Sequence, residues 1–174
     1  MDLGLVDRIT ADAIGEPGMR TFYLQARAGG ELVTVIVEKQ QVELLANSVL
    51  ELLADEPVET APVDADLDLE EPVEPRWRVG RLSIGYDRDD DRFLLEITEF
   101  EPDVEDEEEG PRSFVEGEPD QIRLWATRGQ MLALATHGTE VAERGRPTCQ
   151  FCGNPMDPEG HACPATNGHR KPRG

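Results

Sequence analysis

The residues best suited to chemistry lie near the C-terminal end of the chain, where three cysteines and two of the three histidines fall between positions 149 and 169. These residues are Cys149, Cys152, His161, Cys163 and His169. The first two cysteines have the Cys-x-x-Cys spacing that puts two thiolates on one tight turn, and Gly153 follows directly. Thiolate and imidazole are the ligands of tetrahedral structural zinc sites. The spacing therefore predicts a structural Zn²⁺ site.

The fourth ligand of this site is either His161 or His169, beside the three cysteines. His161 and Cys163 are two residues apart, so on an extended segment their side chains point to the same face. His169 would instead close the site from a following turn. The spacing favours His161. Because so short a segment has almost no core, the metal would supply its folding free energy, typically ~10–16 kcal/mol for structural zinc.

Other chemistries fit these residues less well. A redox Cys-x-x-Cys motif normally opens a helix, whereas Pro155 and Pro158 follow here. A catalytic zinc site needs an open coordination position, and the four ligands already fill a tetrahedron although Glu159 is a nearby base. Three incidental thiols remain the plain alternative. A calcium site is suggested by four clustered aspartates, Asp87, Asp89, Asp90 and Asp91. Their loop lacks the glycine and the distal glutamate of an EF-hand, so it is better explained as a solvated hairpin turn.

Acidic residues dominate the charge of the chain and are concentrated in two stretches. The 174 residues include 17 Lys and Arg against 37 Asp and Glu, a formal charge of −20. Residues 51–75 hold ten acids and no base, and residues 101–120 hold ten acids with Arg112. The surface as a whole is therefore a poor match for nucleic acid or an anionic membrane.

Both stretches are also rich in proline, with seven of the thirteen prolines of the chain. Proline interrupts helices and central strands. We expect flexible, solvated insertions at about residues 55–75 and 101–120. Such polyanionic segments would attract a basic protein partner, and the attraction would weaken with salt.

Alternating apolar residues predict two β-hairpins, one short strand and two helices. The hairpins pair residues 20–27 with 31–37 and residues 76–86 with 92–100, and a phase slip at Gly80 predicts a β-bulge. The short strand covers residues 121–125. One helix spans residues 40–54, and the other begins at the Thr127–Gln130 capping box and stops at Gly145.

This order of elements predicts an α+β fold. An antiparallel sheet from two hairpins plus a short strand would carry two helices on one face. Residues 1–147 form this domain, with the acidic insertions inside it, and residues 148–174 form a zinc-ribbon or knuckle-like module with a basic tail. No internal repeat is evident in the sequence.

The C-terminal pattern resembles that of an uncharacterised actinobacterial domain-of-unknown-function family. It reads Cys-x-x-Cys-Gly-x-Pro-x-Asp-Pro-Glu-Gly-His-x-Cys-Pro-x-x-Asn-Gly from residue 149, after Gly145-Arg146-Pro147. Residues 15–26 and 38–41 resemble the same family, so the resemblance covers the whole chain. The family often carries tyrosine near the position of His169, which favours His161 as the ligand. The resemblance implies no established activity.

Three classes of function remain open. The favoured one is a non-enzymatic interaction protein that uses its acidic segments to engage a basic partner. The second is an enzyme, or an enzyme subunit, with Arg20, Arg76, Arg78 or His137 in a cleft between the sheet and the zinc module. The third is nucleic-acid contact through residues 141–174, where five bases exceed three acids. Against this reading, the arginines would pair with the chain's own acidic stretches.

Neither a secretory leader nor an apolar run of about 18 residues, as a membrane span needs, is present. We therefore expect a cytoplasmic protein that does not enter a membrane. The sequence does not indicate an oligomeric state.

Overall fold

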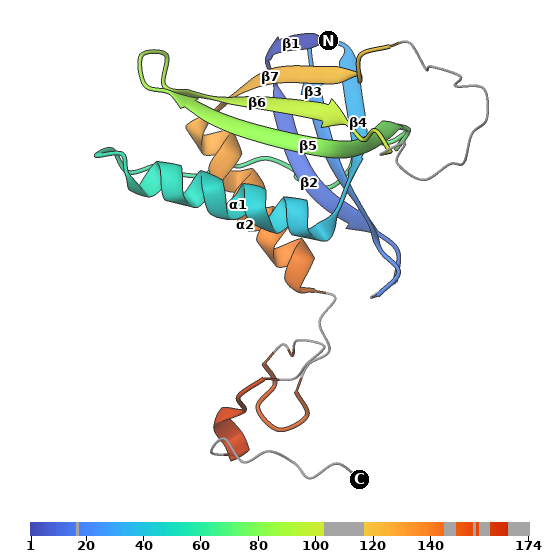
Figure 1. Cartoon of the computed structure of the whole chain (residues 1–174). Helices are drawn as coiled ribbons and strands as arrows, with labels where there is room; N and C mark the ends of the chain where they lie inside the picture. The colour runs from blue at the N-terminus through green and yellow to red at the C-terminus, as the bar shows by residue number, and fades with distance from the viewer. Residues whose placement is uncertain (17, 103–116, 145–148, 155, 157–160, 167–174) are drawn as a thin grey trace, which may run out of the picture.

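A computed structural model describes residues 1–16, 18–102, 117–144, 149–154, 156 and 161–166. The chain forms one curved sheet with two helices beneath it, followed by a small C-terminal module (Figure 1). The strands are β1 (Asp2–Leu5), β2 (Arg8–Ile14), β3 (Thr21–Ala28), β4 (Glu31–Val37), β5 (Pro75–Asp87), β6 (Arg92–Glu99) and β7 (Gln121–Thr127). The helices are α1 (Lys39–Ala54), α2 (Arg128–Glu143) and the 3₁₀ turn η1 (Pro164–Thr166). The predicted α+β class is confirmed.

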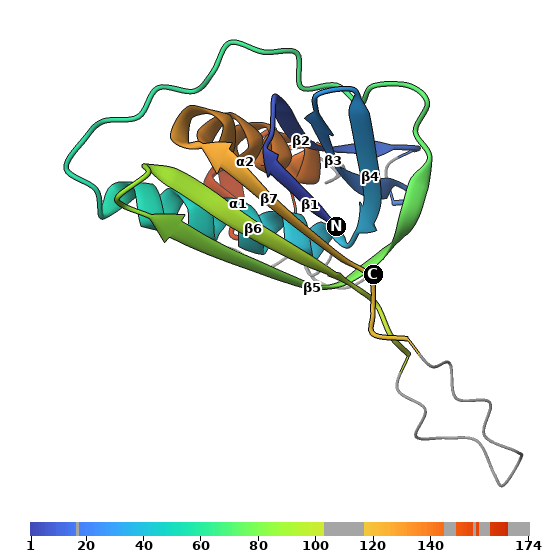
Figure 2. The ribbon, with the colours of Figure 1, turned by 90° about the horizontal axis from the view of Figure 1, so that it is seen from above.

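The seven strands lie in the order β1-β7-β6-β5-β4-β3-β2. β1 pairs with β7 and β4 with β5 in parallel, and the other neighbours are antiparallel. β1 and β2 lie at opposite edges although only Val6 and Asp7 separate them in the chain. The Val6 N–H donates to Trp125 O at 2.8 Å, and the Asp7 N–H donates to Arg27 O at 2.8 Å. This two-residue link joins the two edges at one end, so the sheet must curl (Figure 2).

The structure also supports the details of the predicted second hairpin. Phe93, Leu95 and Ile97 face the core and are at most 2% exposed. The β5–β6 register shifts between Val79 and Arg81, as the predicted bulge requires. A Cβ at Gly80 would lie 2.7 Å from Phe100 Cα, so glycine permits this close approach. The predictions did not include β1 and β2.

The fold contains an internal duplication. Each half is a three-stranded antiparallel meander followed by a 16-residue helix: β2-β3-β4-α1 and then β5-β6-β7-α2. In both helices the third residue is a glutamine whose side chain folds back onto the backbone of the N-cap residue. Gln41 Oε1 accepts the Glu38 N–H at 2.8 Å, and Gln130 Oε1 accepts the Thr127 N–H at 2.8 Å.

The two glutamines also tie each half to the other. Gln41 Nε2 donates to Val79 O of β5 at 3.3 Å, and Gln130 Nε2 donates to Val6 O, just before β2, at 3.0 Å. Each helix start therefore holds the beginning of the opposite half. The two halves therefore repeat each other in topology and in these glutamine contacts.

Buried residues match between the halves when the strand registers and helix starts are aligned. The matched pairs are Phe22 with Phe93, Leu24 with Leu95, Val35 with Leu124, Val42 with Met131 and Leu45 with Leu134, and all ten are buried. They belong to a single hydrophobic core. The duplication is hidden in the sequence because the outward-facing residues differ between the halves.

The start of α2 gives a test of local stability. Thr127 Oγ1 accepts the Gln130 N–H at 3.3 Å, which satisfies one of the free amides at the helix N-terminus. We expect Thr127→Ala to lower the free energy of unfolding by about 1 kcal/mol in chemical denaturation. Thr136→Ala, on the exposed side of the same helix, is the matched control and should change it by less than about 0.5 kcal/mol. Equal effects would contradict the role of the cap.

Candidate metal centre

Four side chains of the C-terminal module converge on one point. The donor atoms of Cys149, Cys152, His161 and Cys163 all lie within 4.8 Å of one another. Cys149 Sγ lies 3.8 Å from Cys163 Sγ, and Cys152 Sγ lies 3.2 Å from His161 Nε2. Two sulfurs that each bind a tetrahedral zinc ion at about 2.3 Å stand about 3.8 Å apart. The spacing of the donors therefore suits a tetrahedral ion of this size.

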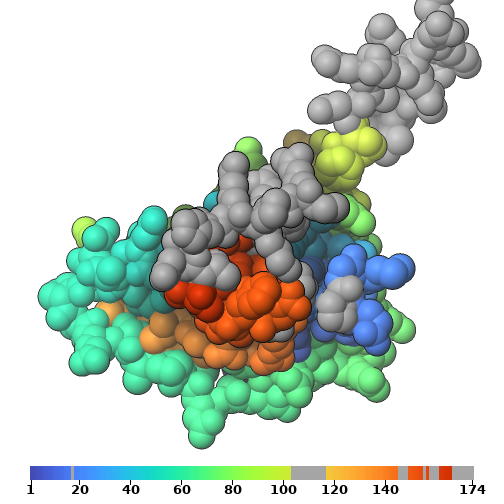
Figure 3. All heavy atoms as spheres, turned by 90° about the horizontal axis from the view of Figure 1, so that it is seen from below, coloured from blue at the N-terminus to red at the C-terminus, as the bar shows by residue number. Residues whose placement is uncertain are grey.

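The backbone around the first two cysteines forms a tight knuckle. The Gly153 N–H donates to Cys149 O and the Cys149 N–H donates to Asn154 O, both at 2.8 Å. Gly153 has φ +73°, in the left-handed region that glycine adopts readily. The Phe151 N–H points to Cys149 Sγ at 3.4 Å. Seen from the side of the module (Figure 3), the described residues, in orange to red, form a compact surface group.

The backbone N–H groups favour negative charge on the first thiol. Hydrogen bonds from the N–H groups of Phe151 and Cys152 lower the pKa of Cys149. The N–H of Asn154 acts in the same direction on Cys152, but burial and the neighbouring cysteines outweigh it and raise the pKa of Cys152. Crowding several thiolates disfavours their ionisation, and a divalent cation between them would remove that penalty.

The structure brings together the four residues that the sequence favoured as ligands. His161 presents Nε2 to the cluster, and its buried Nδ1 has no hydrogen-bond partner among the described residues. Cys149 is 5% exposed, and the other three residues are half-buried. The alternative ligand, His169, lies outside the described residues.

Comparisons with known proteins place the chain in a family. A family sequence profile described as "Protein of unknown function (DUF3090)" matches residues 2–163. The chain belongs to the DUF3090 family. The match includes all four clustered residues and ends at Cys163. Searches of curated proteins and of solved structures found no significant match. No helix among the described residues is long and apolar enough to cross a bilayer.

The arginines proposed for an enzyme site have structural contacts instead. Arg20 donates to Val141 O at 2.7 Å, near the end of α2, and its guanidinium lies 5.1 Å from the Phe22 ring centre. Arg76 bonds to Glu31 at 2.8 Å, and Arg78 bonds to Glu38. These two arginines do pair with acids of the chain, but not with acids of the two acidic stretches.

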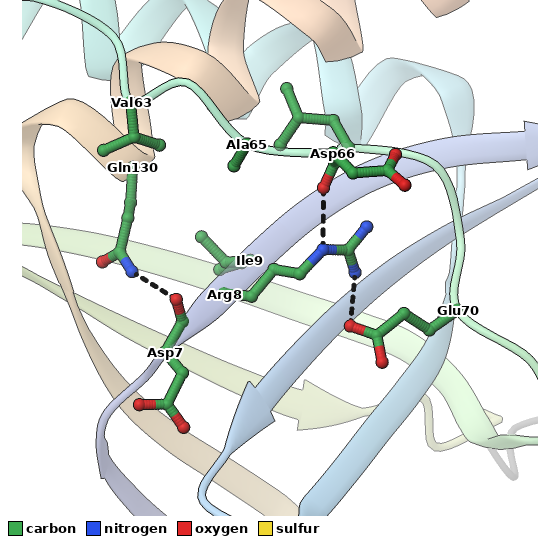
Figure 4. Close-up of a pocket in the computed structure, with 9 residues that line it drawn as sticks. Asp7, Arg8, Ile9, Val63, Ala65, Asp66, Glu70 and Gln130 are labelled. Atoms are coloured by element: carbon green, nitrogen blue, oxygen red, sulfur yellow. Dashed lines mark hydrogen bonds and ion pairs between the residues drawn. The ribbon is translucent and has the colours of Figure 1, made fainter.

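The other residue proposed for an enzyme site, His137, belongs to α2, and its side chain points toward Asp12 of β2. Its Nε2 stands 3.6 Å from Asp12 Oδ2, beyond hydrogen-bond distance. A cavity of about 400 Å³ lies between β2 and residues 63–70 (Figure 4). His137 and Asp12 do not line it. The structure therefore does not gather the proposed enzyme residues in one cleft of the described chain.

Residues 55–74, here called the strap, form one wall of that cavity. Val63, Ala65 and Leu67 of the strap line it together with Ile9 and Gln130. The strap has no helix or strand, as its prolines predicted. It contains most of the first acidic stretch, and its predicted flexibility stays a prediction. Most of the second acidic stretch lies outside the described residues.

Side chains of β2 and β3 hold the strap through its backbone. Arg8 Nε donates to Asp66 O at 2.8 Å, and Thr10 donates to Leu67 O. Gln25 makes a two-way pair with Glu70, since its Nε2 donates to Glu70 O at 3.0 Å and its Oε1 accepts the Glu70 N–H at 2.8 Å. These polar residues alternate with apolar ones, so by sequence they look like a solvated strand face.

One carboxylate of the strap is also bound. Glu70 accepts hydrogen bonds from Arg27, and Arg8 lies 3.3 Å from its other oxygen. The hydrogen bond from Arg27 lowers the pKa of Glu70 from its usual 4.5, and the nearby charges act in the same direction. Because this pKa is lowered on folding, the contact stabilises the docked strap above about pH 4.5 and is lost as the pH falls through the folded-state value.

This linkage predicts acid release of the strap. We expect the side-chain amide resonances of Gln25, which report the strap contact, to shift in an NMR titration as the pH falls below about 4.5. Glu70→Gln should remove that transition. Asp64→Asn, at an exposed strap position, should retain it. A transition that survives in Glu70→Gln would show that another group controls the strap.

Proposed function

We propose that Cys149, Cys152, His161 and Cys163 bind one structural Zn²⁺ ion. The observation that carries this proposal is the convergence of three sulfurs and one imidazole nitrogen within 4.8 Å. Soft ligands in this number favour zinc, and four protein ligands leave no open position for a substrate. Reduced thiolates also fit a cytoplasmic protein.

Metal analysis of the full chain, purified without chelator, tests this site. We expect one equivalent of zinc in the wild type and in His169→Ala, and much less in Cys149→Ser and His161→Ala. Zinc loss in His169→Ala with retention in His161→Ala would assign the fourth ligand to His169. A wild-type protein free of zinc would exclude the site.

We infer that the protein acts by binding a basic protein partner rather than by catalysis. The strap supports this inference because its backbone faces the body while Asp64, Asp66 and Asp68 are exposed. Leu67 between them is half-buried and lines the cavity beneath, together with parts of Ala65 and Asp66. The three exposed carboxylates recur at every second residue and so form a row, and the attachment of the strap to β2 and β3 fixes where that row lies. A fixed row of like charges loses less conformational entropy on binding than a free chain would.

A pull-down from low-salt extract tests the acidic row. The wild type should recover a basic protein, and the triple variant Asp64→Asn, Asp66→Asn, Asp68→Asn should lose it. The matched control removes the same number of charges outside the strap, at the exposed residues Asp2, Asp89 and Asp90, and should retain the partner. Recovery should fall steeply as salt rises. Equal recovery by both triple variants would contradict a role for the strap.

A further inference from the structure

The internal duplication gives the sheet two equivalent outward faces. In the first half the central outward triplet is Thr10, Gln25 and Thr34, which are direct neighbours across β2, β3 and β4. In the second half the triplet at the same register is Ser83, Glu96 and Arg123, across β5, β6 and β7. Both triplets are polar and occupy the middle of a meander. They can therefore be compared position by position.

The first triplet shows what such a face binds. Thr10, Gln25 and Thr34 are at most 2% exposed, although they lie on the face away from the helices. The strap covers this face, and its backbone supplies most of the contacts: the carbonyls of residues 66, 67, 68 and 70 accept hydrogen bonds, and the Glu70 N–H donates one. The face therefore recognises an extended peptide backbone together with one carboxylate, that of Glu70.

The second triplet is open. The side chains of Glu96 and Arg123 are 41% and 47% exposed, and the strap returns to β5 beside β2–β4 without crossing β6 and β7 (Figure 2). The Arg123 and Glu96 side chains stand 3.9 Å apart, beyond hydrogen-bond distance, so both retain bonding capacity. None of the other described residues buries these positions as the strap buries Gln25.

The residues around the second triplet also have counterparts on the covered face. Arg81 occupies the position of Arg8, two residues before the triplet member on the first strand, and it is exposed. Trp125 lies two residues beyond Arg123, and the Arg123 guanidinium stands 5.9 Å from its ring centre. The open face thus keeps an arginine at one of the two positions that contact Glu70 in the first half, that of Arg8, and it adds a half-buried aromatic ring.

We propose that Arg81, Ser83, Glu96, Arg123 and Trp125 form a docking surface for an extended, acidic peptide segment of a partner protein. Arg123 and Ser83 would donate to backbone carbonyls, and Glu96 would accept a backbone N–H. Arg81 would bind a carboxylate as Arg8 does, and an apolar side chain would pack on Trp125. The strap on the first half is the template for this binding mode. The surface is separate from the carboxylate row of the strap, so either can fail without the other.

Selection from a displayed library of random 12-residue peptides, against the full chain, tests the surface. We expect enrichment of sequences with an aspartate or glutamate, and a change in Trp125 fluorescence when a selected peptide binds. Arg81→Ala and Arg123→Ala should each weaken its affinity at least about tenfold, since each removes a hydrogen bond to a charged group. Arg76→Ala and Arg78→Ala, the matched controls on β5, should change it less than about twofold.

Three results would overturn the proposal. The first is a selection that yields no peptide sensitive to Arg81→Ala or Arg123→Ala. The second is a selected peptide whose NMR shift changes map to the strap or the metal centre instead of β5–β7. The third is a dimer in solution that dissociates in Arg123→Ala, because a second copy of the chain would then cover this face. Circular dichroism of each variant confirms that exposed-site substitutions leave the fold intact.

Discussion

Removal of the proposed zinc ion is expected to unfold the C-terminal module and to leave the sheet and its two helices folded. The described residues of the module contribute only Cys149 to the buried apolar set, and their sole regular element is the three-residue turn η1. So little buried surface cannot offset the loss of chain entropy. The free energy of zinc binding, ~10–16 kcal/mol in comparable small sites, would then be the free energy that folds the module.

Hydrogen–deuterium exchange with and without a strong chelator measures this effect. Chelation should abolish protection of the backbone N–H groups of Cys149 and Gly153, which are hydrogen-bonded in the knuckle. Protection in β6 and α2 should persist. Cys152→Ser should show the loss without chelator, and chelator should then add nothing. A module whose protection is unchanged by chelation would contradict metal-dependent folding.

The second large effect concerns the body of the protein. Phe93 is completely buried in β6, and its ring centre lies 4.9 Å from that of Tyr86. Phe93→Ala removes most of a side chain and leaves a cavity in a single core shared by both halves. We expect the free energy of unfolding to fall by about 3–5 kcal/mol. This is a large part of the stability of an ordinary domain.

Chemical denaturation monitored by circular dichroism measures this loss. Phe100→Ala is the matched control because Phe100 is 52% exposed just after the same strand, and it should cost less than about 1 kcal/mol. Phe22→Ala, at the equivalent position of the first half, should approach the cost of Phe93→Ala. If Phe22→Ala were nearly neutral, the two halves would not share the core equally.

Local patterns explain the parts of the fold that the sequence predicted. The capping box at Thr127 and Gln130 places the start of α2, because both residues of the motif lie within one helical turn. Alternation over residues 92–99 identifies β6 and its buried face. The candidate metal-binding cluster could be predicted from the sequence for the same reason, since its four residues lie within fifteen positions of one another.

Contacts between distant residues explain what the sequence did not reveal. β2 buries Ile9 and Ala11. Because alanine is only weakly apolar, the alternation of apolar and polar residues in this segment does not identify a strand. The strap attaches to Thr10 and Gln25 across sequence separations of 57 and 45 residues. Polar strand residues that bind a distant backbone have the same local pattern as residues that face water. The parallel β4–β5 pairing likewise depends on a connection with no periodicity of its own.

The pairing of β1 with β7 constrains the order in which the protein can fold during synthesis. Arg123 donates its backbone N–H to Met1 O at 2.9 Å, so β1 takes its place only beside a strand made more than a hundred residues later. The first meander and α1 can leave the ribosome and associate early, but Gln130 can bind Val6 only after α2 has emerged. Until then, the apolar faces of the first half lack the helix that completes their core. Chaperones that bind nascent chains would therefore meet this half-built sheet before the second copy of the motif is available to cover it.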